Sequence, residues 1–158
     1  MSVAFRRDSD EEHLEPKFEL PVPVGPNMVT PRGHALIAER NATLEAELDR
    51  AEDETRRKEL QRDLRYWRSR LTSAQIAPRP SGNEVAIGTE VEIIQGGARR
   101  TFTIVGHDEA DPAAGLIAFG APVARMLMGC EAGEQAEPTG GQAPIDIVAV
   151  RPSDRLGW

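Results

Sequence analysis

Two neighbouring amphipathic stretches between residues 30 and 76 most strongly limit how this chain can fold. In each stretch apolar residues recur every three or four positions, as they do on one face of an α-helix. If the chain turns back near Thr55 and Arg56, the two apolar faces meet. The facing pairs are then Ile37 with Ala74, Leu44 with Trp67, Leu48 with Leu64, and Ala51 with Leu60. The spacing, which also includes Leu71, therefore predicts an antiparallel helical hairpin over residues 30–76.

The charges and end signals of this stretch agree with the hairpin. Residues 45–54 are mainly acidic and residues 56–70 mainly basic, so opposite charges would flank the packed faces. Thr30 and Pro31 form a helix start signal, and a Pro-rich segment after Ile76 cannot continue a helix. With about 20 residues in each arm, a rise of about 1.5 Å per residue gives a rod of about 30 Å. The alternative is a charged helix that packs its apolar edge against another chain.

Bulk composition excludes several classes of protein. The 158-residue chain has a net charge of −7, which argues against a general nucleic-acid-binding protein. Its one cysteine, Cys130, cannot form an intramolecular disulfide and is typical of a reducing cytosol. No apolar run has the length of a membrane span, and the N-terminus lacks the apolar region of a signal peptide. We therefore expect a cytoplasmic protein without membrane contact.

The regions on either side of the hairpin differ sharply in composition. Residues 1–29 form an acidic and Pro-rich segment, in which we expect 1–19 to be a disordered solubilising tail and 20–29 an extended lead-in. A functional acidic arm is the less favoured alternative for this tail. Residues 77–84 are predicted to be a linker.

Residues 85–152 have the pattern of a small α+β domain. Two alternating runs, 89–94 and 99–105, flank the turn 95–98 and predict a β-hairpin. Further strands are predicted at 115–120, 131–137 and 145–150, and a short helix at 121–129, where Pro122 stands at the start and Gly129 past the end. One helix against a five-stranded, mostly antiparallel sheet is an α+β fold, followed by a tail at 153–158.

Four segments in this order resemble the bacterial Gre transcription-elongation factors. They are Thr30-Pro31-Arg32-Gly33, Leu71-Thr72-Ser73-Ala74-Gln75-Ile76, Ile104 to Asp111, and Ala121 to Gly129. The resemblance implies a C-terminal FKBP-like domain that binds the rim of the secondary channel of RNA polymerase. It also implies a coiled-coil rod inserted into that channel, which promotes cleavage of backtracked RNA.

The chain departs from the family at the end of the rod. The family's rod is longer by several helical turns, and its tip carries an Asp and a Glu three residues later in a loop that is absent here. Those carboxylates help hold a second Mg²⁺ in the polymerase active site. Four acids are candidates for that role here, and any two could serve: Asp49, Glu52, Asp53 and Glu54. The neighbouring Arg56, Arg57 and Lys58 favour the alternative, in which a basic tip repels Mg²⁺ and contacts RNA or polymerase acids.

The resemblance also identifies a docking surface at the predicted short helix. Its candidate residues are Pro122, Val123, Ala124 and Arg125. We expect Val123 and Leu127 to face the sheet, and Pro122 and Arg125 to face outward. The run from His107 to Pro112 is interpreted as a polar surface loop, because a lone His beside acids is rarely a metal site and no phosphate-binding Gly-Lys motif accompanies it. Cys130 has no visible catalytic setting.

Three functions remain open from the sequence. The first is a monomeric Gre-type factor that binds RNA polymerase and contacts nucleic acid only through the elongation complex. It is no enzyme itself, binds no metal or cofactor when free, and shares Mg²⁺ with the polymerase when it stimulates cleavage; a short arm would instead favour a channel-occupying regulator without cleavage. The second is a prolyl isomerase, disfavoured because the domain offers only Phe102 and Phe119 for an aromatic pocket. The third is a self-associating coiled-coil adaptor.

Overall fold

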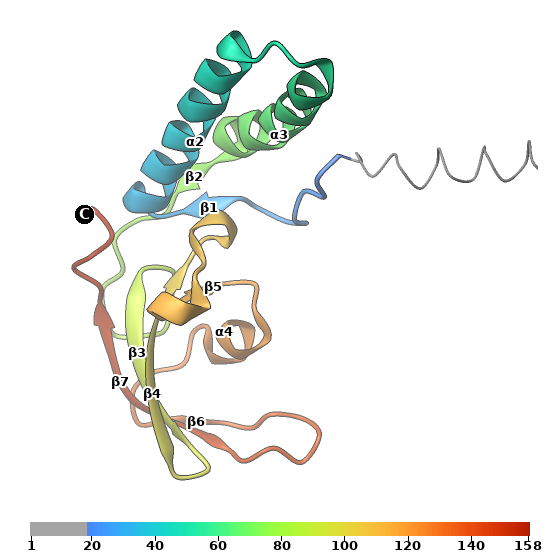
Figure 1. The fold of residues 1–158 in the computed structure, drawn as a ribbon. Coiled ribbons are helices and arrows are strands. Elements are labelled where there is room, and N and C mark those ends of the chain that lie inside the picture. The colour runs from blue at the N-terminus through green and yellow to red at the C-terminus, as the bar shows by residue number, and fades with distance from the viewer. Residues whose placement is uncertain (1–18) are drawn as a thin grey trace, which may run out of the picture. The chain divides into compact units, whose positions relative to one another are not determined.

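The structure is a computed structural model that describes residues 19–158 (Figure 1). The N-terminal tail expected at residues 1–19 lies, except for Glu19, outside the described residues. The α-helices are α2 (Pro31–Arg50), α3 (Glu54–Ser73) and α4 (Pro122–Leu127). The strands are β1 (Met28–Val29), β2 (Gln75–Ile76), β3 (Thr89–Gln95), β4 (Ala98–Val105), β5 (Leu116–Ala118), β6 (Gln135–Ala136) and β7 (Ile145–Pro152).

The described chain divides into two compact units. The hairpin unit contains residues 19–24 and Ala38–Thr72, and the sheet unit contains Gly25–Ile37 and Ser73–Trp158. The boundary crosses α2, so the first two turns of this helix belong with the sheet. The hairpin stretch predicted as one piece over 30–76 is thus divided between the units.

The hairpin unit confirms two antiparallel helices joined by a short connection (Figure 1). Leu44, Leu60 and Leu64 are fully buried between them, and Leu48, Ala51 and Trp67 pack around this cluster. Because apolar area removed from water contributes about 25 cal/mol per Å², this seam is the main source of stability in a unit that lacks a larger core.

The predicted position of the turn is wrong. The connection consists of residues 51–53 rather than Thr55 and Arg56, and α3 already begins at Glu54. The reason is capping: the Asp53 carboxylate accepts a hydrogen bond of 2.9 Å from the Arg56 backbone N–H and starts α3 there. The centre of the turn therefore lies earlier in the chain than predicted, at Glu52. Across the two helices, Asn41 Nδ2 donates a hydrogen bond of 2.8 Å to the Trp67 carbonyl.

The sheet unit is an α+β domain with a five-stranded sheet in the order β5-β4-β3-β7-β6. The β3–β4 hairpin and the helix at Pro122 lie where the sequence predicts them, although the strands expected at 115–120 and 131–137 shorten to Leu116–Ala118 and Gln135–Ala136. Gly96 and Gly97 both adopt positive φ, as the two-residue turn between β3 and β4 requires. Within this five-stranded sheet the pairing of β4 with β5 is parallel, and the other three pairings are antiparallel.

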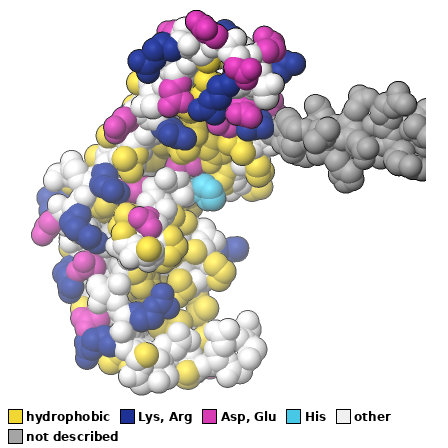
Figure 2. Space-filling view, viewed as in Figure 1, with side chains coloured by type: hydrophobic (Ala, Val, Ile, Leu, Met, Phe, Trp, Pro, Cys, Tyr) yellow, Lys and Arg dark blue, Asp and Glu magenta, His cyan; other side chains and the backbone are white. Residues whose placement is uncertain are grey.

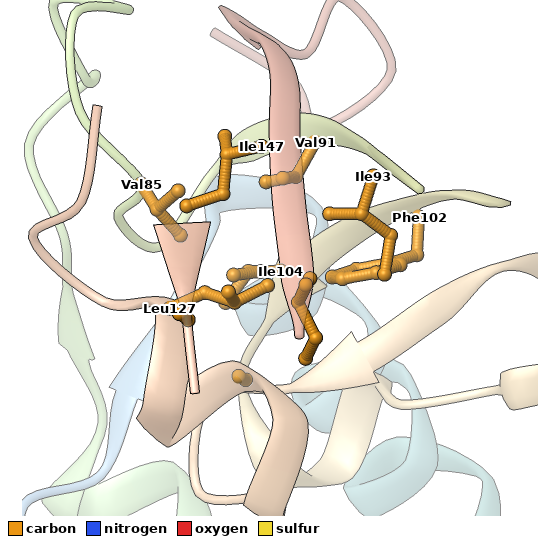
Figure 3. Close-up of a cluster of buried hydrophobic side chains, with 10 residues drawn as sticks. Val85, Val91, Ile93, Phe102, Ile104, Leu127 and Ile147 are labelled. Atoms are coloured by element: carbon orange, nitrogen blue, oxygen red, sulfur yellow. The ribbon is translucent and has the colours of Figure 1, made fainter. Parts of the chain in front are cut away.

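The core of this unit lies between one face of the sheet and α4. Figure 3 shows the side chains of Val91 and Ile93 on β3, Phe102 and Ile104 on β4, and Ile147 on β7 gathered with Leu127 of α4. These side chains alternate along each strand, as expected for a sheet with one face covered. Packing of Ala124 and Leu127 into this core therefore fixes the position of α4 on the sheet.

Both ends of the sheet unit are also packed. Strands β1 and β2 form a parallel pair. Gly106 lies so close to β1 that a Cβ added at Gly106 would be 2.5 Å from the Met28 carbonyl oxygen. Leu156, within the segment expected as a tail, is buried beside Val105 and Leu116. Its carbonyl accepts a 2.9 Å hydrogen bond from the Arg32 N–H in the first turn of α2. Across residues 19–158, no helix is long and apolar enough to cross a membrane.

Candidate functional site

The hairpin tip (residues 49–54) is held by charged side chains. Arg57 Nη1 donates two hydrogen bonds of 2.9 Å, to the carbonyls of Leu48 and Ala51 at the C-terminal end of α2. The Leu48 carbonyl also accepts the Ala51 N–H at 3.3 Å. A cation at these last carbonyls of the helix interacts favourably with the helix dipole. Arg56 pairs with Glu47 on α2 at 3.2 Å and with Glu59 on α3 at 3.3 Å. The tip is therefore a fixed turn.

The four candidate acids of the tip have different surroundings. Asp53 is engaged as the N-cap of α3, so its carboxylate already accepts the Arg56 N–H. Asp49, Glu52 and Glu54 are exposed, Asp49 on the last turn of α2 and Glu54 on the first residue of α3. Within the described residues, no three His, Cys, Asp or Glu side chains are grouped so that they could hold a metal ion. The tip thus offers single carboxylates that could complete a metal site supplied elsewhere.

Charges of both signs cover the hairpin. Figure 2 shows Lys and Arg side chains interspersed with Asp and Glu over the two helices. Glu45 on α2 pairs with Arg68 on α3 at 3.4 Å, across the helices. Cross-helix pairs of this kind agree with the predicted acidic-against-basic arrangement, although each exposed pair contributes little to stability.

The predicted docking residues on α4 of the sheet unit differ in their exposure to solvent. Ala124 and Leu127 are each 0% exposed and lie in the core, and Val123 is partly buried against it. The side chain of Ala124, which the sequence analysis includes among the docking candidates, is therefore not available to a partner. Pro122 and Arg125 are exposed, as expected. The short helix thus offers two outward residues on a rigid support.

An apolar groove begins directly after α4. It has a volume of about 390 Å³ and is lined by residues that include Met28, Pro78, Pro80, Ile87 and Met128. Met128, which follows the last residue of α4, is among the exposed large apolar side chains of the unit. The exposed residues of α4 and this groove therefore lie next to each other.

A buried carboxylate connects the start of α2 to the sheet unit. Glu109 is 4% exposed, and it lies in a short 3₁₀ turn after β4. It accepts hydrogen bonds from Thr30 Oγ1 at 2.6 Å and from Arg32 Nη1 at 2.7 Å. Gly33 leaves room for it, since a Cβ at that position would lie 2.8 Å from Glu109 Oε1. Thr30 also caps α2, because its Oγ1 accepts the Gly33 N–H at 3.0 Å.

The sequence did not reveal this cluster. The predicted polar surface loop from His107 to Pro112 is correct for the exposed His107 but wrong for the buried Glu109. The two halves lie 79 positions apart, at Thr30 and Glu109, so no local spacing predicts their contact. One signal was available: two of the four segments that carry the family resemblance, Thr30 to Gly33 and Ile104 to Asp111, contain all members of the cluster.

Comparison with known proteins assigns the sheet unit. Residues 79–152 match the family model of the C-terminal domain of the transcription elongation factors GreA/GreB. The chain is 34% identical over 93 residues to transcription elongation factor GreA of Desulfovibrio desulfuricans, covering 55% of this chain and 57% of that protein. It is 35% identical over 89 residues to GreA of Alkalilimnicola ehrlichii, covering 52% and 56%. The matched region thus spans less than two thirds of these relatives.

The chain also matches solved structures of GreA-related proteins, with low TM-scores. The GreA factor homolog 1 (Gfh1) protein of Thermus thermophilus gives a TM-score of 0.38 at 16% identity, covering 80% of this chain and 99% of that one. A GreA/GreB factor from Nitrosomonas europaea gives 0.39 at 22% identity, covering 81% and 99%. These TM-scores are low, so the assignment rests on the sequence matches. Residues 79–152 thus match the C-terminal domain of the GreA/GreB elongation factors, and the chain spans less than two thirds of the length of its curated relatives.

Proposed function

We propose that this protein is a Gre-type transcription factor that binds RNA polymerase at its secondary channel and regulates elongation. The observation that supports this most is the GreA/GreB C-terminal domain at residues 79–152, in a chain that also carries an antiparallel helical hairpin. In this proposal the sheet unit docks on the polymerase and the hairpin enters the channel. The protein assists the polymerase, performs no reaction alone, and works in the cytoplasm.

The docking role is assigned to the exposed side of α4. Pro122 and Arg125 are exposed on a helix whose other residues, such as Ala124 and Leu127, are locked in the core. A rigid backbone with an exposed cation and an exposed apolar ring suits a protein surface of acidic and apolar character. We expect the adjacent groove at Met128 to receive an apolar side chain of the polymerase.

The role of the tip depends on its carboxylates. Mg²⁺ binds oxygen ligands and usually takes only one or two protein carboxylates, beside waters and phosphates. Asp49, Glu52 and Glu54 are exposed and could supply such a ligand, whereas Asp53 would first have to give up its cap. Hydrogen bonds and ion pairs hold the positive charges of Arg56 and Arg57 at the same tip. These positive charges lower the attraction of the tip for a cation. We therefore favour a factor that occupies the channel, with cleavage as the second candidate.

The experiment is RNA cleavage in a backtracked elongation complex with Mg²⁺, with and without the protein, alongside a binding measurement on the same complex. The occupancy proposal expects binding without faster cleavage, together with inhibition of a competing cleavage factor. Faster cleavage that is lost in Asp49→Ala, Glu52→Ala, Asp53→Ala or Glu54→Ala would instead establish delivery of carboxylates.

Docking is tested separately with two arginine variants. Arg125→Glu should abolish binding, and Arg100→Glu on β4, an exposed arginine on the sheet, is the matched control that should bind normally. If the unsubstituted protein does not bind the polymerase, the whole proposal is refuted.

A further inference from the structure

Residues 153–158, expected from the sequence to be a tail, pack against the sheet unit and lie beside the start of α2 (Figure 1). The Ser153 N–H donates a hydrogen bond of 2.8 Å to the Gly88 carbonyl. The side chain of Leu156 is 1% exposed and belongs to a cluster of buried apolar residues. We call residues 153–158 the clasp. Both the clasp and these partners belong to the sheet unit.

The clasp supplies an acceptor to the first turn of α2. At this end of the helix, the Gly33 and His34 N–H groups donate to the hydroxyl and the carbonyl of Thr30. The Arg32 N–H has no acceptor within its own helix, and it donates to the Leu156 carbonyl at 2.9 Å. The clasp therefore completes the N-terminal cap of α2 with a group from a distant part of the sequence.

Two glycines allow the clasp to pack closely on its neighbours. A Cβ added at Gly157 would lie 3.2 Å from Pro31 Cβ in α2. A Cβ added at Gly88 would lie 2.5 Å from Trp158 Cη2 and 3.1 Å from Pro80 Cδ, so the Trp158 ring lies next to the linker that follows β2. Both glycines have positive φ, +90° and +96°, a conformation that other residues rarely adopt. The clasp thus contacts both α2 and the linker.

These two contacts lie close to the positions where the chain leaves and re-enters the sheet unit. The chain passes into the hairpin unit after Ile37 and returns to the sheet unit at Ser73. We call the two sheet-unit segments next to these positions, Pro31–Ile37 and Ser73–Glu84, the base of the hairpin. Pro78 and Pro80 in the second segment have no N–H to donate, so side-chain packing has a larger part in holding it. One short segment, the clasp, contacts both parts of the base.

We propose that the clasp is a positioning element, in which Leu156 and Trp158 hold both parts of the base in one conformation. A short segment outside the sheet opens more easily than the core, so the clasp can open while β3 and β4 stay folded. When it opens, the Arg32 N–H loses its acceptor and Pro80 loses its aromatic neighbour, so both parts of the base loosen together. The inference rests on the proposed function only in its consequence at the polymerase: docking through α4 persists, while the hairpin enters the channel less often.

The test in the free protein is hydrogen exchange of the full chain, measured by mass spectrometry. Trp158→Ala should raise the exchange rate of residues 77–84 and also that of residues 32–37, each by about fivefold, as for the loss of one net hydrogen bond. Trp158→Phe keeps an aromatic ring and should restore slow exchange. Val148→Ala removes an exposed apolar side chain from β7 of the same unit, and this matched control should change neither rate.

Two exchange patterns would overturn the proposal. Faster exchange in residues 77–84 alone would show that Trp158 packs locally, and faster exchange throughout β3 and β4 would show a general loss of stability. Gly157→Ala is the second variant, because it keeps Leu156 and Trp158 but places a Cβ against Pro31. It should also accelerate exchange in both parts of the base, and unchanged rates would contradict the proposal.

The consequence at the polymerase is tested with a photoreactive cross-linker on the hairpin tip, at Glu52→Cys in a Cys130→Ala background. Trp158→Ala should bind the elongation complex with unchanged affinity but lose most of the cross-link to the polymerase, and Trp158→Phe should regain it. An unchanged cross-link in Trp158→Ala would overturn the positioning role. If the unsubstituted protein does not bind, the proposed function fails, and the exchange rates alone decide whether the clasp holds the base.

Discussion

Replacement of Glu109 tests the structure most directly, because this carboxylate connects two segments that are distant in the sequence, the start of α2 and the 3₁₀ turn after β4. Glu109→Ala removes the acceptor of both Thr30 Oγ1 and Arg32 Nη1. Thr30 is 0% exposed, so its hydroxyl proton loses its acceptor in the interior, at a cost of about 1–3 kcal/mol, while its oxygen still accepts the Gly33 N–H. The Arg32 side chain is 42% exposed and can return to water, so the loss of its ion pair adds only about 0–1 kcal/mol.

We therefore expect Glu109→Ala to lower the free energy of unfolding of the sheet unit by about 1–4 kcal/mol. Glu109→Gln keeps the shape and an acceptor for Thr30 and loses only the charge, so its effect should be about 1 kcal/mol. The chain supplies a reporter for each unit, since Trp158 packs on the sheet-unit cluster and Trp67 on the hairpin cluster.

The assay is urea unfolding followed by the fluorescence of Trp158 in a Trp67→Phe background. Glu137→Ala, an exposed acid of the same unit, is the control and should change stability by less than about 0.5 kcal/mol. Equal unfolding midpoints for Glu109→Ala and this control would refute the argument that the buried carboxylate stabilises the unit. Equal losses for the Ala and Gln variants would show that the neutral amide cannot serve Thr30.

Three further substitutions have definite expectations. Gly106→Ala should destabilise the sheet unit by about 1–3 kcal/mol, because the new Cβ would clash with the Met28 carbonyl oxygen. The φ of Gly106, −74°, is ordinary and adds no backbone strain. An unchanged unfolding curve followed by Trp158 fluorescence would contradict this expectation. Arg57→Ala should cost the hairpin about 1 kcal/mol by uncapping α2, and Arg57→Lys should recover only part of it because Lys lacks the planar fork; Trp67 fluorescence in urea measures both. Burial, and secondly the charge of Glu134, raise the pKa of the Cys130 thiol, so alkylation should be slower at pH 8 than for a free thiol and faster in Glu134→Gln; identical pH profiles would contradict it.

Much of the secondary structure follows from the sequence, because its signals are local. The four-residue spacings of Leu44 with Leu48 and of Leu60 with Leu64 indicate two helices with facing apolar seams. The alternation along β3 and β4 is enough to predict a hairpin. Pro122 at the start of α4 is a similar local signal. The position of the turn between the helices was predicted wrongly because several registers satisfy the apolar spacing. Capping by Asp53 and Arg57 selects one of these registers.

The candidate site could be predicted only as a set of residues. The sequence indicated the tip acids and the exposed Pro122 and Arg125, but not that Ala124 is taken up by the core or that Asp53 is occupied as a cap. Both facts depend on which groups lie nearby in space. An isolated pattern assigns a residue to a face, and the burial of that face depends on what covers it.

The amino-acid sequence by itself determined the helical hairpin, the α+β domain and the charge of each segment, since these depend on periods and composition within a few turns of chain. Only the tertiary structure decided that Thr30, Arg32 and Glu109 meet and that Leu156 closes the first turn of α2. The physical reason is burial. A carboxylate such as Glu109 can be removed from water only where donors from other segments replace that water, and no local pattern encodes where those donors come from.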